Sequence, residues 1–439
     1  MEPDAPSTDP VVQAADRHAS WPELFFDLVA VAGVAGLAHT LSGEFPPLAL
    51  GLYATLFIAF WLTWTTYMLH GNSSSDGPHL TRLLAGMFGL GVMAAAIPGL
   101  TAFFLGHGDG HSGALQANIF ALAYIVTRSV GAHSWDHWSV VTEFPVVQQT
   151  IGVVPWLVSL WVSGNGKLIL WAVGLAIDVV ALTLISGEDR LRHSRERVAA
   201  VRSRAERAET KGRGRVHRDR HGNRRTMLER IQSFQVQGVR LAPEHLAERL
   251  GLLVIIVLGE GVIQVVHSAS EVEWHRSLLV AALASFVLLV GLFVMSLELG
   301  HAGIPYLREG SVGVRSQLAL HALVTATLAA LATALASVIN EPGTSLPAQQ
   351  RWLLCGSVAA YFALGVAAAA LARARRPLAM GIAFVTGVLV PLGIAVLADD
   401  TSGTGVVGYV VLVVVGHMVL WRRRGQPTDG PPVAAPAGG

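Results

Sequence analysis

Two carboxylates stand where a membrane would penalise them. The stretch 21–41 is apolar enough to cross a bilayer, yet it carries Glu23 and Asp27, four residues apart. Residues at this spacing share one face of an α-helix, and a carboxylate at the centre of a spanning helix costs about 2.5–3.5 kcal/mol on insertion scales. The pair therefore indicates a cation or proton site, or else a structural ion pair with an arginine such as Arg82 or Arg128.

A second set of polar residues lies on the apolar stretch 243–267. Arg249 and Glu260 are eleven residues apart, and eleven steps of about 100° return to within roughly 20° of the same helical stripe. Gln264 continues that stripe one turn later. Glu260 lies about 18 Å along the helix from Glu248, near the middle of a ~30 Å hydrocarbon core. The position indicates a functional carboxylate, with a buried structural hydrogen bond as the alternative.

Two further residues are candidates for the same chemistry. Arg128 ends the fourth apolar stretch and is expected to be the counter-charge of Asp27 or Glu23. His321 lies on an apolar stretch one turn after Gln317, where a histidine is either a hydrogen-bonded core residue or a ligand. The expected ion- or proton-binding set is Glu23, Asp27, Arg128, Arg249, Glu260, Gln264 and His321.

Motifs for other chemistries are weak or absent in the sequence. The histidine-rich stretches 107–111 and 133–137 each offer three possible ligands in a loop, and zinc needs three or four convergent ones. They are interpreted as polar loops, so no metal is expected. The sequence has no Walker-type phosphate loop, HExxH or G-x-S-x-G motif. Neither a cofactor, an enzymatic activity nor an ATP-driven pump within this chain is therefore predicted.

Composition places these residues in a membrane protein. Charged residues make up 14% of the 439 residues and hydrophobic ones 52%, whereas an ordinary soluble domain is about 25% charged. The mean hydropathy is +0.51. Cys355 is the only cysteine, so no intrachain disulfide can form.

Apolar stretches of spanning length recur along the chain, and a spanning helix needs roughly 20 such residues. Twelve are found, near 22–42, 47–69, 81–105, 114–132, 147–164, 167–187, 246–267, 277–299, 316–339, 352–371, 378–397 and 404–421. The predicted fold is all-α: a polytopic transmembrane helix bundle of about twelve spans, in two six-helix halves. The expected divisions are a disordered lead 1–20, a first half 21–187, a basic loop 188–242, a second half 243–421 and a disordered tail 422–439.

The distribution of basic residues sets the expected orientation. With Met1 in the cytoplasm, 28 of the 31 Lys and Arg residues fall on the inner side, and only Lys167, Arg276 and Arg351 fall outside. This asymmetry is the one that the positive-inside rule describes. Both termini are therefore expected in the cytoplasm.

The stretch 188–240 carries 16 Lys and Arg residues against seven acids. It is interpreted as a solvated cytoplasmic connector, with binding to anionic lipid headgroups as an alternative. Nucleic-acid binding is not expected, because Phe234 is the only aromatic residue there for base stacking. The bilayer and a small ion or solute are the other expected partners.

Two segments resemble one known family. The opening WPELFFDLVAVAGVAGLAHTL and the later ERLGLLVIIVLGEGVIQVV are similar to the first and seventh helices of bacterial low temperature requirement A (LtrA) proteins, and LALHALVTATLAAL resembles the later helix that places His321. The resemblance covers about 21–421. It implies a multi-pass protein of the bacterial inner membrane, in a family named for a growth phenotype.

The leading prediction is a secondary transporter or ion-conducting protein that uses Glu23, Asp27 and Glu260. The alternative is a membrane-embedded lipid-modifying or cold- and stress-adaptation factor without transport activity. A third interpretation is a scaffold whose basic loop docks a partner.

Overall fold

The chain forms two compact units, one of residues 1–36 with 51–249 and one of residues 37–50 with 250–439. The computed structural model describes residues 12–13, 18–73, 80–106, 110–133, 140–142, 151–184, 196, 200, 203, 207, 216–218, 224–226, 237–300, 313–372 and 377–424. The predicted domain divisions stay predictions, because most of the basic loop and both terminal tails lie outside these ranges.

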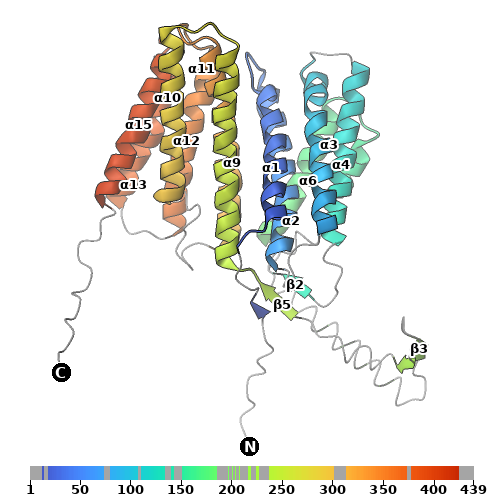
Figure 1. Cartoon of the computed structure of the whole chain (residues 1–439). Helices are drawn as coiled ribbons and strands as arrows, with labels where there is room; N and C mark the ends of the chain where they lie inside the picture. The colour runs from blue at the N-terminus through green and yellow to red at the C-terminus, as the bar shows by residue number, and fades with distance from the viewer. Residues whose placement is uncertain are drawn as a thin grey trace, which may run out of the picture. The chain divides into compact units, whose positions relative to one another are not determined.

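The first unit is a bundle of apolar helices (Figure 1). Its helices are α1 (Trp21–Leu37), α2 (Pro47–Ser73), α3 (Leu80–Leu105), α4 (Gly110–His133), α5 (Val153–Ser159), α6 (Asn165–Leu184) and the first turns of α9 (Pro243–Ser270). Helix α3 packs along α4, and α5 packs against α4 and α6. Stacked aromatic rings fill the contact of α4, α5 and α6, with Trp156 and Trp171 4.8 Å apart between ring centroids.

A glycine permits the close approach of α1 to α2. A Cβ atom at Gly33 would overlap the ring of Phe60 on α2. Small residues let apolar helices approach backbone to backbone where hydrocarbon offers no hydrophobic drive. The Phe60 ring therefore packs directly against the backbone of α1 at Gly33.

Short strands adjoin the helical part of the first unit. Strands β1 (Val12–Gln13) and β2 (Val140–Thr142) both pair in parallel with β5 (Gln237–Arg240). Strands β3 (Val216–Arg218) and β4 (Arg224–Thr226) form an antiparallel pair. No strand was predicted from the sequence, because runs of two to four residues lack a readable alternation. Strand β5 ends directly before α9, so it fixes where that helix begins.

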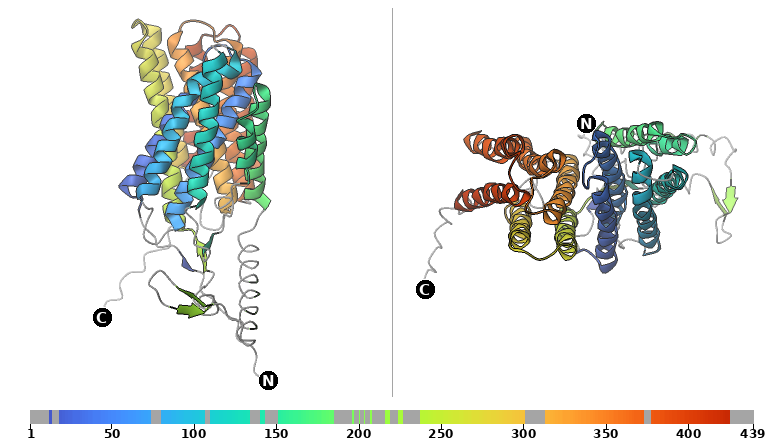
Figure 2. Two further views of the ribbon diagram at one scale, coloured as in Figure 1. Left: turned by 90° about the vertical axis from the view of Figure 1, so that its right-hand side faces the viewer. Right: turned by 90° about the horizontal axis from the view of Figure 1, so that it is seen from above.

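The second unit is also helical. It holds the remainder of α9, η1 (Ala38–Thr40), α10 (Arg276–Phe293), η3 (Val294–Glu298), α11 (Val314–Asn340), α12 (Ala348–Leu371), α13 (Pro377–Phe384), η5 (Val385–Leu389), α14 (Val390–Leu397) and α15 (Gly403–Arg424). Helix α11 packs on α12, α10 on α15, and α14 on α12. The segments η3 and η5 are π-helical turns, so α13, η5 and α14 form one continuous helical stretch. Figure 2 shows α10 to α15 in yellow to red.

Eight described helices are long and apolar enough to cross a membrane: α2, α3, α9, α10 with η3, α11, α12, the stretch α13–η5–α14, and α15. The protein is therefore a helical multi-pass membrane protein, as its composition predicted. By length and apolar composition, the described residues thus give eight candidate spans, and the predicted number of about twelve is not confirmed. Of the remaining predicted spans, 147–164 contains only the seven-residue α5 among the described residues.

Large exposed side chains mark where the helices meet the lipid boundary. Trp21 begins α1 and is 85% exposed, and Trp161 follows α5. In the second unit, Trp274 and Trp352 lie at the starts of α10 and α12 and are also exposed. Tryptophan favours the interface between hydrocarbon and water, so these positions fit helix ends at that interface.

Candidate functional site

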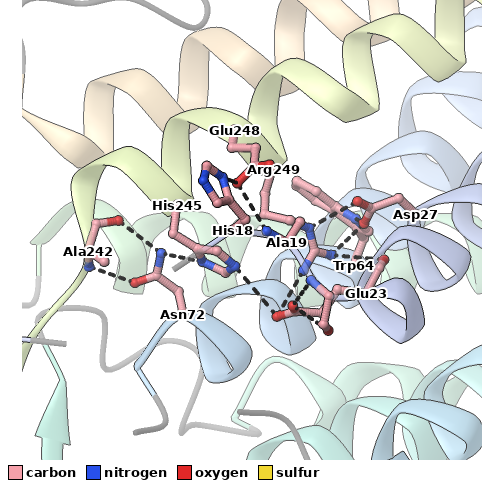
Figure 3. A network of polar contacts seen from close by, with 11 residues as sticks. His18, Ala19, Glu23, Asp27, Trp64, Asn72, Ala242, His245, Glu248 and Arg249 are labelled. Carbon is pink, nitrogen blue, oxygen red and sulfur yellow. Dashed lines mark hydrogen bonds and ion pairs between the residues drawn. The ribbon is translucent and has the colours of Figure 1, made fainter. Parts of the chain in front are cut away.

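Arg249 binds both carboxylates of α1. Its Nε lies 3.0 Å from Oδ2 of Asp27 and its Nη2 lies 2.5 Å from Oδ1. Its Nη1 lies 3.3 Å from Oε1 of Glu23. All three side chains are at least 99% buried. The i,i+4 spacing on α1 thus does what the sequence predicted, because both acids face one partner (Figure 3).

Neighbouring donors complete the bonding of the two acids. Trp64 on α2 donates its indole N–H to Oδ1 of Asp27 over 2.7 Å. The backbone N–H and the hydroxyl of Ser20 both donate to Oε2 of Glu23, over 2.8 and 2.7 Å. Ser20 directly precedes α1, so the chain entering the helix supplies these two hydrogen bonds.

His245 lies between Glu23 and Asn72, as Figure 3 shows. Its Nε2 is 3.7 Å from Oε1 of Glu23, and its Nδ1 is 3.0 Å from Nδ2 of Asn72. Ala242 fixes the orientation of the Asn72 amide, because its N–H donates to Oδ1 and its carbonyl accepts from Nδ2. An amide nitrogen can only donate. Nδ1 of His245 must therefore accept, which leaves a neutral ring with its proton on Nε2, facing Glu23.

Within the four side chains of Glu23, Asp27, Arg249 and His245, the charges do not balance. Two carboxylates face one guanidinium and one neutral imidazole, so the group carries one negative charge in excess when both acids are ionised. An uncompensated buried charge is costly. One proton, or one small monovalent cation, would restore neutrality.

Residues 18–416 match the family described as bacterial low temperature requirement A protein (LtrA). The chain belongs to this family. The match confirms the resemblance seen in the first and seventh apolar segments, which carry the two acids and Arg249.

A curated relative of this LtrA-family chain is the uncharacterized protein RA0937 of Rhizobium meliloti (strain 1021), 28% identical over 267 residues. The aligned part covers 58% of this chain and 52% of the relative. The chain therefore spans about half the length of the curated relative that it matches.

The expected partner of the acids was wrong. Arg128 contacts neither Glu23 nor Asp27 among its described bonds but pairs with Asp178 on α6, Nη2 to Oδ2 over 3.1 Å, and donates to the hydroxyl of Thr66 on α2. Both charges of this pair are at least 98% buried. The counter-charge is instead Arg249 on α9. It lies 222 residues from Asp27 in the sequence, so spacing along the chain could not predict this pairing.

Glu260 is less enclosed than its central position suggested. It is half-buried and receives one long hydrogen bond, 3.4 Å, from Nε2 of Gln264. His267, three residues further along α9, is exposed and pairs with Glu271 over 3.6 Å. In the LtrA-family chain, Glu260 and Gln264 thus make a local pair.

His321 is fully buried and its Nε2 lies 3.1 Å from the carbonyl of Leu250. It was predicted to join the site or to be a satisfied core residue, and the bond to a backbone carbonyl fits the second description.

Sequence reasoning missed His245, Trp64, Asn72 and Ser20. For His245 a signal existed, since it stands one turn before Arg249 and so shares its helix face. Among the described residues, no group of three or more His, Cys, Asp or Glu residues could hold a metal ion. The two histidine-rich stretches lie mostly outside the described residues.

Proposed function

We propose that this LtrA-family protein transports protons or a small monovalent cation, with Glu23 and Asp27 as the binding carboxylates. It crosses the bacterial inner membrane twelve times, and both termini are cytoplasmic. The single observation that supports this function is the charge balance of the buried cluster.

A transport site must bind its ion reversibly. In the cluster, Arg249 neutralises one of the two acids, and His245 stays neutral because Asn72 occupies its Nδ1. The remaining negative charge attracts a proton or cation and can release it when solvent reaches the site. A balanced ion pair, such as Arg128 with Asp178, lacks this property.

The twelve-span count rests on helices beyond the eight that are long and apolar enough. Helices α1, α4 and α6 are apolar and pack into the first unit, and α5 lies in the remaining predicted span. With these four, the basic residues remain on one side, as positive-inside orientation requires. Glu260 is a further carboxylate that the transported ion would meet.

Flux through purified protein in liposomes tests the proposal. A pH-sensitive dye inside the vesicles reports proton uptake under an imposed gradient. Glu23→Gln and Asp27→Asn each leave Arg249 with one carboxylate, so the cluster becomes neutral without a bound ion. We expect flux to fall by at least about tenfold.

Glu271→Gln is the matched control, because Glu271 is an exposed acid on the segment after α9. It should transport at the wild-type rate. Wild-type flux in both Glu23→Gln and Asp27→Asn would reject the assigned site, and no flux in the wild type would reject proton transport. An alkali-cation uptake assay separates the two ions.

A further inference from the structure

We propose that Ser20, together with the surface pair His18 and Glu248, is the port through which Glu23 exchanges protons with solvent. This inference rests on the proposed function and names the entry route of the same site. It follows from how the two oxygens of Glu23 are used.

The two carboxylate oxygens of Glu23 face different surroundings. Oε1 lies beside Nη1 of Arg249 and Nε2 of His245, both of which are buried. Oε2 receives the backbone N–H and the hydroxyl of Ser20. Ser20 is partly exposed. Oε2 is thus hydrogen-bonded directly to a residue that solvent reaches.

The two residues before Ser20 continue the connection to the surface. The N–H of Ala19 donates to Oε2 of Glu248 over 3.0 Å. Nδ1 of His18 lies 3.7 Å from the same oxygen. The His18 side chain is 99% exposed and that of Glu248 is 35% exposed. Figure 3 shows His18 and Glu248 beside the buried cluster.

The buried side chains around His245 and Asp27 are poor proton relays. A proton passing through His245 would have to leave by Nδ1, where Asn72 donates and fixes the amide against Ala242. Asp27 is held by Arg249 and by Trp64, which are donors only. Arg249, His245 and Asp27 are titratable or charged groups that face Glu23, and none of these three offers a hydroxyl relay.

The transfer balances with Ser20 unchanged. The Ser20 hydroxyl gives its proton to Oε2 of Glu23, and its Oγ takes one from hydronium in the solvent that reaches Ser20. One O–H bond breaks and one forms at Oγ, Glu23 gains one proton, and the outer donor loses one. The carboxylate of Glu248 attracts protons to the mouth of this path.

Chemical rescue tests the port in the full-length protein in liposomes. We expect Ser20→Ala to lower proton flux by at least about tenfold, and Ser20→Thr, which keeps a hydroxyl, to retain it. Glu248→Gln should slow flux less. A small diffusible acid such as imidazolium, added outside, should restore flux in both slowed variants, because it delivers protons directly. A variant that is merely misfolded would not respond.

Two matched controls come from the other end of α9. Ser270→Ala removes a hydroxyl that bonds the His267 carbonyl, and Glu271→Gln breaks a surface Glu–His pair like that of Glu248 with His18. Both should transport normally. Wild-type flux in Ser20→Ala, or a loss that imidazolium leaves uncorrected, would overturn the port while sparing the proposed function. Absence of flux in the wild type would remove both.

Discussion

The side-chain amide of Asn72 decides which ring nitrogen of His245 carries the proton. Nδ2 of Asn72 lies 3.0 Å from Nδ1 of His245, and the backbone of Ala242 holds the amide from both ends. The imidazole therefore presents an N–H to Glu23. Because this donor is neutral, it does not compensate the excess negative charge of the two carboxylates.

Replacing Asn72 with aspartate should change the protonation of the His245 ring. A carboxylate at position 72 accepts from Nδ1, which favours the doubly protonated imidazolium; the new carboxylate and the new cation together leave the net charge of the cluster unchanged. In histidine-labelled protein, the His245 ¹⁵N signals should move from the Nε2–H tautomer to the cationic form. Subtracting the spectrum of His245→Gln assigns the signals among the 17 histidines. An unchanged neutral tautomer would contradict the assignment.

Removing Arg249 should be much more damaging than removing either acid. Arg249→Met leaves two buried carboxylates with no cation, and breaking a buried pair in this way costs about 3–5 kcal/mol. We expect a clear drop in thermal unfolding temperature in detergent. Adding Glu23→Gln and Asp27→Asn should recover part of it. Arg276→Met, at an exposed arginine, is the control and should unfold like the wild type.

Gly152 makes room for the Arg128–Asp178 pair. A Cβ atom at this position would overlap the Asp178 carboxylate and lie 2.6 Å from the carbonyl of Gly174. Gly152→Ala should therefore destabilise the protein by about 1–3 kcal/mol, as overpacking does. Gly51→Ala is the control, since that position in α2 has nothing within 4 Å. Equal unfolding temperatures for both variants would refute the tight packing at Gly152.

Substituting Glu260 should affect stability less than substituting Asp27. Glu260 is half-buried with one bond of 3.4 Å, whereas Asp27 is fully buried and receives bonds from Arg249 and Trp64. We expect Glu260→Gln to unfold within about 1 kcal/mol of the wild type. Its flux shows whether the transported ion uses this carboxylate. A loss of stability as large as that of Asp27→Asn would contradict the difference in bonding.

Cysteine labelling tests the span count and the orientation. The single cysteine, Cys355, is buried and inaccessible to a membrane-impermeant maleimide. Ser345→Cys, in the turn between α11 and α12, should react in intact cells. Ser233→Cys, in the basic loop, should react only after lysis. The reverse pattern would invert the orientation, and labelling of both in intact cells would contradict the twelve-span arrangement.

Periodicity and composition predicted most of the fold. Apolar runs are long and strong signals, so eleven of the twelve predicted segments begin within a few residues of a described helix. The span predicted at 147–164 contains only the seven-residue α5 among the described residues, and the π-helical turns were not predicted. A short helix gives too few residues for a period, and a π-turn depends on how neighbouring helices pack around it.

Three residues of the cluster were singled out from the sequence, but their pairings were not predicted. Glu23, Asp27 and Arg249 each stood out, because a charge in an apolar run is visible in one sequence. Which arginine meets which acid depends on the packing of α1, α4, α6 and α9, and Arg128 was assigned to the wrong carboxylate. Asn72 and Ser20 gave no signal, since their roles come from backbone geometry around them.

The exposed tryptophans provide a built-in depth gauge. Trp21, Trp161, Trp274 and Trp352 stand at helix ends, while Trp64, Trp156 and Trp171 are buried inside the first unit. Lipids brominated near the headgroup should quench the emission of the former set, and leave the latter bright. The ratio of quenched to unquenched emission then measures how far the helix ends move relative to the headgroups when bilayer thickness changes.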